Sequence, residues 1–185
     1  MTQVSTAPLT LIAPAKLNLF LHINARRDDG YHELETLFTF LNFGDTLDFS
    51  VNEAPTILIT GDTKGIADCD NLIYKAALLL KNHCGISSGV KINLTKRLPM
   101  GGGVGGGSSD AATTLLALNK MWNTQLNIDE LANLGLQLGA DVPVFIRGKS
   151  AIAHGIGEQL VDVELEQKWY CIVHPNQHVS PAKIF

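Results

Sequence analysis

The part of the sequence best suited to chemistry is a glycine-rich stretch near its middle. Six of the seven positions from Gly101 to Gly107 are glycine. Glycine has no Cβ, so this backbone can adopt positive φ values and approach a ligand closely. The stretch leads into a helix-forming segment, 110–119, whose first amides lack partners within a helix and carry the positive end of its dipole. Because such amides bind phosphate, the stretch predicts an anion site, with nucleotide phosphates as the first choice of ligand.

Two hydroxyl residues, Ser108 and Ser109, follow the last glycine. Serine is a favoured residue at the N-cap of a helix, where its oxygen accepts a hydrogen bond from a free backbone amide. We therefore expect these serines to cap the helix and to add hydroxyls that can contact a phosphate.

Three other interpretations of the glycine stretch are weaker. A disordered linker would have polar, low-complexity flanks, which are absent here. A Walker A loop requires Lys-Ser/Thr after its last glycine. Gly101, Gly103 and Gly106 match the G-x-G-x-x-G spacing of dinucleotide-binding proteins. However, segment 91–95 alternates apolar and polar residues, whereas the first strand of that fold is almost continuously apolar.

Other candidate residues lie nearer the start of the chain. Residues 16–24 alternate as in a strand, which places Lys16 and Asn18 on one face. A turn then leads to Tyr31 and His32, an aromatic ring and an imidazole that could stack on and hydrogen-bond a nucleobase. Taken alone, the first pair also fits a solvated strand face, and the second fits a purely structural strand start.

One acidic residue stands out later in the chain. Asn127 and Glu130 have capping-box spacing and predict the start of a helix that ends at Gly139. Asp141 follows, and we expect the apolar residues 142–146 after it to form a strand. Asp141 is thus predicted at a helix–strand junction.

The remaining pattern predicts short strands separated by turns, with one further helix over 70–83 capped by Asp70. This order favours an α+β fold of two layers, in which helices pack on a mixed sheet. The expected strands, besides 16–24, are 34–43, 46–51, 56–60, 90–95, 150–154 and 159–163.

Composition narrows the class of protein. The 185 residues are 45% hydrophobic and 17% charged, as in an ordinary globular protein, and the net charge of −4 argues against a nucleic-acid partner. The three cysteines form no C-x-x-C pair, which predicts buried free thiols in a reducing cytosol. The apolar run 9–13 is too short for a signal peptide or a membrane span, so a cytoplasmic protein without a membrane partner is expected.

Taken together, these motifs resemble those of the GHMP small-molecule kinases. The segments that carry the likeness are 14–19, 99–112 and 138–143. Three more segments, 30–32, 70–72 and 96–103, narrow it to members that use ATP and Mg²⁺ to phosphorylate the 2-hydroxyl of a cytidyl-linked methylerythritol, on the non-mevalonate route to isoprenoids. A related member that acts on mevalonate, homoserine or a sugar, and a non-catalytic nucleotide-binding protein, remain alternatives.

The resemblance implies a role for each matching residue. Asp141 would take the proton of the acceptor hydroxyl or orient it, and Lys16 would keep Asp141 ionised and neutralise charge in the transition state. Tyr31 and Phe185 would sandwich the cytosine of a cytidine-diphosphate-linked polyol, with His32 on the edge of the base and Asn18 near the reacting end. No protein ligand to Mg²⁺ is assigned. The residues implied to bind ATP are Asn71, Leu72, Lys96, Pro99, Met100, Gly101, Gly102, Gly103, Val104, Gly105, Gly106, Gly107, Ser108 and Ser109.

The resemblance also implies two domains with the active site in the cleft between them. We expect 1–165 to be the ATP-binding N-terminal domain and 166–185 to begin the second domain or a linker. Asp110 is not accounted for, because an acid close to polyphosphate is repulsive unless it faces a helix N-terminus or a metal.

Overall fold

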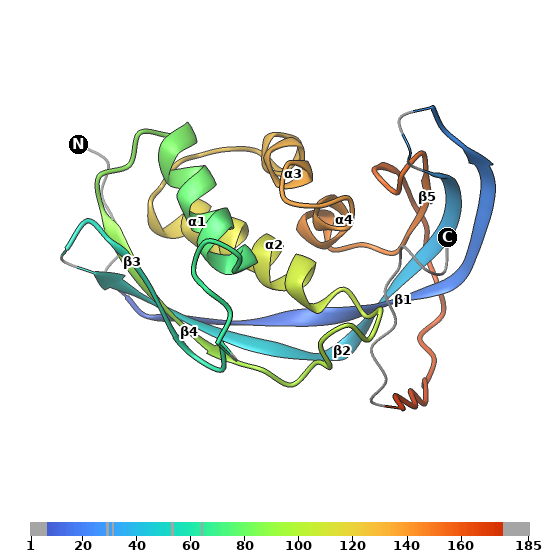
Figure 1. Cartoon of the computed structure of the whole chain (residues 1–185), viewed down its shortest axis with the longest axis horizontal. Helices are drawn as coiled ribbons and strands as arrows, with labels where there is room; N and C mark the ends of the chain where they lie inside the picture. The colour runs from blue at the N-terminus through green and yellow to red at the C-terminus, as the bar shows by residue number, and fades with distance from the viewer. Residues whose placement is uncertain (1–6, 29, 31, 53, 64, 176–185) are drawn as a thin grey trace.

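A computed structural model describes residues 7–175 apart from 29, 31, 53 and 64. A single sheet of six strands lies on one side and four helices pack against it (Figure 1). This confirms the predicted α+β fold with a mixed sheet. The strands are β1 (Leu9–Arg26), β2 (His32–Asn52), β3 (Ile57–Gly61), β4 (Gly89–Thr95), β5 (Ala151–His154) and β6 (Gln159–Asp162). The helices are α1 (Leu72–His83), α2 (Gly106–Met121), α3 (Ile128–Leu136) and α4 (Val142–Arg147).

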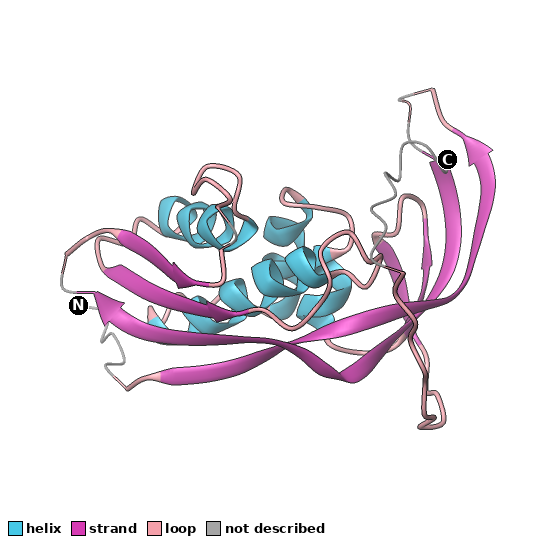
Figure 2. Ribbon diagram, turned by 60° about the horizontal axis from the view of Figure 1, so that its bottom comes forward, coloured by secondary structure: helices cyan, strands magenta, loops and turns pink. Residues whose placement is uncertain are grey.

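The long strand β2 organises the sheet. It pairs with β1 along most of its length, with β4 through its second half and with β5 through its first half, always antiparallel. Strands β3 and β4 are parallel and are joined through α1. Far from the helices, β1 and β2 curl away together beside β5 (Figure 2). Segments 34–43 and 46–51, predicted as two strands, are one strand that runs through Gly44 and Asp45.

Helix α2 lies over the middle of the sheet and is the centre of the core. Leu115 and Leu118 of α2 are fully buried, as are Leu47 and Phe49 on the facing side of β2. Helices α1 and α4 flank α2, and α3 packs beside α4. Burial on nearly all sides of α2 fixes its N-terminus in space, and the glycine stretch leads directly into that end.

The start of α2 differs from the prediction. The helix begins at Gly106, inside the glycine stretch, and its N-cap is Gly105 with φ of 73°. The carbonyl of Gly105 accepts the first hydrogen bond, from the amide of Ser109, at 2.8 Å. Ser108 and Ser109 lie in the first turn, so the expectation that they cap the helix is wrong. A capping side chain must come from the residue before the helix, and only glycine readily takes the left-handed conformation found there.

Two further local predictions are corrected. The cap of α1 is Asn71, whose side chain accepts from the amide of Ile73 at 2.9 Å, and not Asp70. Residues 142–146 form α4, not a strand. Pro143 lies in the first turn of α4 and Gly148 ends it with φ of 65°. A short, fully buried apolar run has the same pattern in a helix and in a strand, and the proline decides for the helix. The capping box of Asn127 and Glu130 at α3 is confirmed.

The prediction of buried thiols is wrong for two of the three cysteines. Cys69 and Cys171 are exposed, because both lie in segments outside the core, and Cys84 is half-buried at the end of α1. Within the described residues, no helix is long and apolar enough to cross a membrane. The described part of the chain after β6 has no regular structure, and Trp169 there is fully exposed. The domain boundary at residue 165 remains a prediction.

The close approach of β1 to β2 at Gly44 gives a test of the fold. A Cβ at this position would lie 2.0 Å from the carbonyl oxygen of Ala13 and 2.7 Å from Cα of Pro14, and these backbone atoms cannot rotate away. Gly44→Ala should therefore lower the free energy of unfolding by about 2 kcal/mol or more, measured by urea denaturation. At the control position, Gly139, an added Cβ meets nothing closer than 3.8 Å, and Gly139→Ala should change stability by less than about 1 kcal/mol. Equal unfolding midpoints for Gly44→Ala and the wild type would contradict this account of the close approach of the two strands.

Candidate active site

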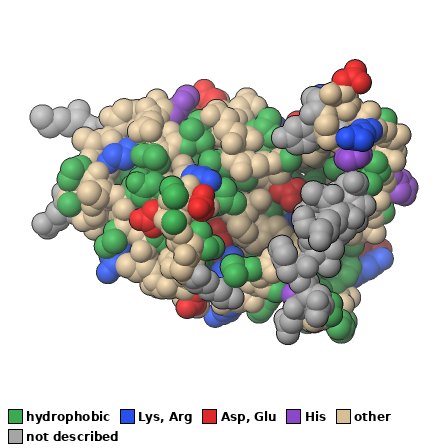
Figure 3. Space-filling model, in the orientation of Figure 1, with side chains coloured by type: hydrophobic (Ala, Val, Ile, Leu, Met, Phe, Trp, Pro, Cys, Tyr) green, Lys and Arg blue, Asp and Glu red, His purple; other side chains and the backbone are tan. Residues whose placement is uncertain are grey.

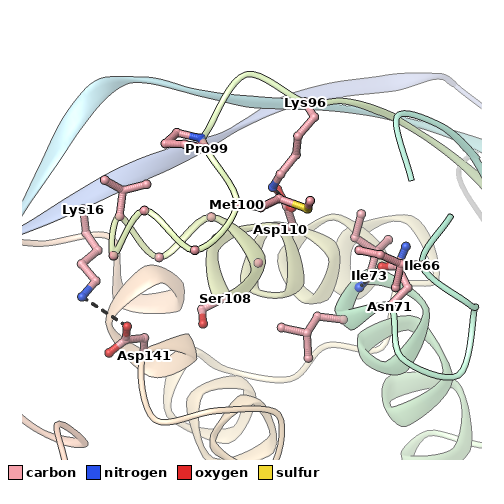
Figure 4. Close-up of a pocket in the computed structure, with 18 of the residues that line it drawn as sticks. Lys16, Ile66, Asn71, Ile73, Lys96, Pro99, Met100, Ser108, Asp110 and Asp141 are labelled. Carbon is pink, nitrogen blue, oxygen red and sulfur yellow. Dashed lines mark hydrogen bonds and ion pairs between the residues drawn. The ribbon is translucent and has the colours of Figure 1, made fainter. Parts of the chain in front are cut away.

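A pocket of about 810 Å³ opens beside the N-terminus of α2. The glycine stretch forms one wall, and the segment that leads into α1 forms the opposite wall (Figure 4). Residues from β1 and from the start of α4 close one end. Figure 3 shows a hollow between the helices and the curled strands, with acidic side chains at its margin.

The structure brings Lys16 and Asp141 together at this closed end. The Lys16 ammonium lies 3.3 Å from a carboxylate oxygen of Asp141, although the two residues are far apart in the sequence (Figure 4). The Lys16 side chain is 7% exposed and that of Asp141 is 34% exposed. The acid thus keeps a face open to the pocket while the lysine is held behind it, as the predicted pairing requires.

A chain of polar contacts fixes Lys16. Its ammonium donates to Asn18 Oδ1 at 2.6 Å, and the Asn18 amide donates to the buried Thr36 hydroxyl at 2.8 Å. That hydroxyl donates to the carbonyl of Phe20 at 2.6 Å. The ammonium also lies 5.0 Å from the centre of the Phe38 ring, within cation–π range. Sequence reasoning found Asn18 but missed Thr36, because a threonine in a strand gives no signal of its own.

The glycine stretch is fastened to the same lysine through the backbone. The amide of Lys16 donates to the carbonyl of Val104 at 3.0 Å. At Gly105, a Cβ would lie 2.7 Å from the Phe145 ring and 3.0 Å from Cγ of Lys16. This backbone therefore needs a glycine both for its positive φ and for its close packing against β1 and α4.

The predicted nucleotide contacts lie largely around one pocket. All residues from Pro99 to Ser108 line it, as do Asn71, Leu72 and Lys96. Ser109 does not line it: the side chain is fully buried, and its hydroxyl has no hydrogen-bond partner in the described part of the chain. On the wall opposite the glycines, the exposed Ile66 adds apolar surface suited to a planar base, and the buried Ile73 also lines that wall. Sequence reasoning missed both, since Ile66 is in a loop without periodicity and Ile73 was read as an ordinary helix residue.

Lys96 has two acidic partners, and one of them is Asp110, whose charge the sequence analysis left without a partner. The Lys96 ammonium lies 2.5 Å from Asp45 and 2.8 Å from Asp110. The other oxygen of Asp45 accepts from the backbone amides of Arg97 at 2.6 Å and Leu98 at 2.8 Å. Asp45 was not anticipated, because Gly44-Asp45 has the composition of a turn and not of a strand interior.

Burial and charge act in opposite directions within this cluster. Burial raises the pKa of Asp110 to about 6, against the attraction of Lys96 and with a smaller contribution from the repulsion of Asp45. Burial also opposes the charge of Lys96, but the two carboxylates outweigh it and raise the pKa of that ammonium. Lys96 is therefore a firmly charged cation between two carboxylates.

The predicted base-binding residues are only partly described. Tyr31 and Phe185 lie outside the described residues. His32 begins β2 and is not among the residues that line the pocket. Leu34 of β2 and Leu21 of β1 do line it. A register shift between Asn18 and Leu21 brings Leu21 onto the pocket wall beside Lys16 and Asn18, which simple alternation would not allow. The cytosine contacts therefore stay a prediction.

Comparison with known proteins shows which family the chain is similar to. Residues 71–149 match the family described as GHMP kinases N terminal domain. The chain carries a GHMP kinase N-terminal domain. It is 79% identical over 176 residues to the 4-diphosphocytidyl-2-C-methyl-D-erythritol kinase of Pseudoalteromonas translucida (strain TAC 125), covering 95% of this chain and 62% of that protein. It is 57% identical over 185 residues to the enzyme of the same name from Hahella chejuensis (strain KCTC 2396), covering 96% and 62%.

A solved structure supports the same assignment. The crystal structure of 4-(cytidine 5'-diphospho)-2C-methyl-D-erythritol kinase superposes on this GHMP kinase domain with a TM-score of 0.74 and 42% identity, over 85% of this chain and 56% of that one. The chain thus spans about three fifths of the length of the curated relatives, each covered to 62%.

The raised pKa of Asp110 predicts a pH dependence of stability. The pKa is about 6 in the folded domain, against the ordinary value of 3.8. The folded state therefore binds this proton more tightly, and the stability gained from protonation is lost as the pH rises through 6. Asp110→Asn lacks this loss, so its free energy of unfolding minus that of the wild type should rise by roughly 1 kcal/mol from pH 5 to pH 7. Urea denaturation at both pH values measures this difference, and an equal difference at the two would show that Asp110 does not titrate in this range.

Proposed function

We propose that the chain is the nucleotide-binding part of an enzyme that transfers the γ-phosphoryl group of ATP to the 2-hydroxyl of 4-diphosphocytidyl-2-C-methyl-D-erythritol. One observation carries the proposal: the Lys16–Asp141 pair lies at the end of a pocket whose wall is the glycine stretch at the N-terminus of α2. The names of the relatives supply the acceptor. The reaction type rests on the geometry.

The pocket divides the work between backbone and side chains. Backbone amides of the glycine stretch and of the first turn of α2 would bind the phosphates, aided by the helix dipole. Asp141 would accept a hydrogen bond from the acceptor hydroxyl and hold it in line with the γ-phosphorus. Lys16, 3.3 Å from Asp141, would offset the negative charge that gathers on the transferred group. Phosphoryl transfer depends mainly on such positioning and charge stabilisation.

Mg²⁺ would enter this pocket with the nucleotide. The described residues contain no group of three or more His, Cys, Asp or Glu side chains arranged to hold a metal. A magnesium ion at an ATP site is usually bound mainly by phosphate oxygens and water, and Asp141, which lines the pocket beside Lys16, could add a carboxylate ligand. Bound there, the ion would neutralise phosphate charge.

The identity of the acceptor can be tested by comparing turnover of several candidate substrates. A coupled assay that detects ADP should show turnover with 4-diphosphocytidyl-2-C-methyl-D-erythritol and not with mevalonate, homoserine or galactose. It should be run on the chain alone and on the chain joined to the remaining part of the Pseudoalteromonas translucida relative, since the chain spans only 62% of that protein. Turnover with mevalonate, homoserine or galactose alone would assign the domain to another GHMP kinase. ADP binding without turnover by the joined protein would indicate a non-catalytic nucleotide-binding role.

The proposed separation of roles predicts different effects for two variants. Asp141→Asn keeps the shape of the side chain but loses its charge, so the rate of phosphoryl transfer should fall by about a thousandfold while the affinity for ADP stays within about threefold. Gly103 has φ of 71° and open space around it, so Gly103→Val strains the backbone without a clash. It should weaken ADP binding by about tenfold or more. Calorimetry with ADP and single-turnover assays measure the two effects, and equal loss of ADP affinity in both variants would contradict separate roles.

A further inference from the structure

The second lysine of the pocket lies at the N-terminus of α2, the end at which the proposed function puts the nucleotide phosphates. The Lys96 ammonium lies against the first residue of α2, 3.2 Å from the position that a Cβ would take at Gly106. Its side chain is 11% exposed. A cation at the positive end of a helix is unfavourable by itself, so its position depends on the two carboxylates that contact it. Together the three charges leave a net charge of −1 beside the glycine stretch.

The two carboxylates are not equivalent. Asp45 is fully buried and has three partners: the ammonium and the two backbone amides of Arg97 and Leu98. Asp110 bonds the ammonium through one oxygen, while its other oxygen is buried and has no hydrogen-bond partner among the residues that the structure describes. Asp110 and Lys96 line the pocket, and Asp45 does not. Asp45 is thus a fixed partner of Lys96, whereas Asp110 has a single contact with the ammonium and lies beside Lys96 on the pocket wall (Figure 4).

We propose that a nucleotide phosphate displaces Asp110 from Lys96 while Asp45 keeps the ammonium in place. In the free protein, Asp110 would then be an internal counter-anion that the ligand replaces. This inference rests on the nucleotide-binding function proposed above and gives Asp110 and Asp45 opposite roles. Asp110 opposes nucleotide binding, and Asp45 positions the cation that favours it.

Displacement leaves a carboxylate beside polyphosphate, so Asp110 should take up a proton when the nucleotide binds. The groups that act directly on Asp110 are Lys96, from the segment after β4, and Asp45 from β2. The other charged residues that line the pocket are Asp62 after β3, Asp70 before α1, Lys16 from β1 and Asp141 before α4. With a pKa of about 6, roughly one Asp110 in eleven is protonated at pH 7, so protonation costs up to about a tenfold loss of affinity.

The experiment compares ADP binding by the wild type and Asp110→Asn at pH 7, by calorimetry in buffers of different ionisation enthalpy. Asp110→Asn should bind ADP tighter, by about threefold to tenfold, and should lack the proton uptake of the wild type. Asp70→Asn removes a charge from the same pocket without touching Lys96, and it should keep the wild-type proton uptake. Lys96→Met should weaken ADP binding.

A merely structural role for Asp110 makes the opposite prediction. Removal of a buried ion pair would loosen the start of α2, and Asp110→Asn would then bind ADP equally or more weakly, which would overturn the inference. Equal proton uptake by Asp110→Asn and the wild type would overturn it as well, and this comparison does not depend on how far either affinity changes. Failure of the wild type to bind ADP at all would instead contradict the kinase proposal, and this inference with it.

Discussion

The hydrogen bond from the Lys16 amide to the Val104 carbonyl is the contact on which the geometry of the site depends. It joins the first strand of the sheet to the glycine stretch, two segments far apart in the chain. Gly105 packs without a side chain between Lys16 and Phe145, so α4 is drawn into the same contact. Because Asp141 lies at the N-terminus of α4, one junction sets the distance between the glycine stretch and the ion pair.

This junction explains why rigid elements surround so many glycines. A glycine segment loses much conformational entropy on folding and is not ordered by its own preferences. Here its ends are held by a buried helix on one side and by the Asp45 contacts to the amides of Arg97 and Leu98 on the other. The segment between can then keep positive φ at Gly101 and Gly103 while it lines the pocket. Loss of either anchor would leave the sequence of the stretch unchanged but remove its shape.

Local patterns predicted the elements better than their ends. Alternation located the strands, and the spacing of Asn127 and Glu130 located α3, because both patterns report contacts made within a few residues. The start of α2 was misplaced because a glycine N-cap has no side-chain signal. Segment 142–146 was predicted as a strand because its burial on all sides hides any period. Pro143 in the first turn favours the helix, which packs against α2 and α3.

The site was predicted in the same uneven way. The pairing of Lys16 with Asp141 followed from the resemblance of whole motifs, whereas Asp45 was missed. Its position has meaning only once β2 is seen to continue through Gly44, which requires the backbone of β1 to pass within contact of that glycine. Such a tertiary contact has no trace in the local sequence. The role of Asp110 was hidden for the same reason, since its partners come from other elements.

Charge in the pocket is arranged so that backbone amides, and not lysines, supply the free positive potential. Each of the two lysines that line the pocket already has an acidic partner, at 3.3 Å for Lys16 and at 2.5 and 2.8 Å for Lys96. The backbone amides of the glycine stretch need no side-chain ordering to meet a phosphate. The two lysines differ in which acidic partner can move away from them. Asp141 is open to the pocket and can turn toward an acceptor while Asn18 still holds Lys16, whereas Asp45 has no route to solvent and must stay with Lys96. A cation that keeps one partner can exchange the other without being left unpaired in a buried place, which is the condition for binding an anion there at low cost.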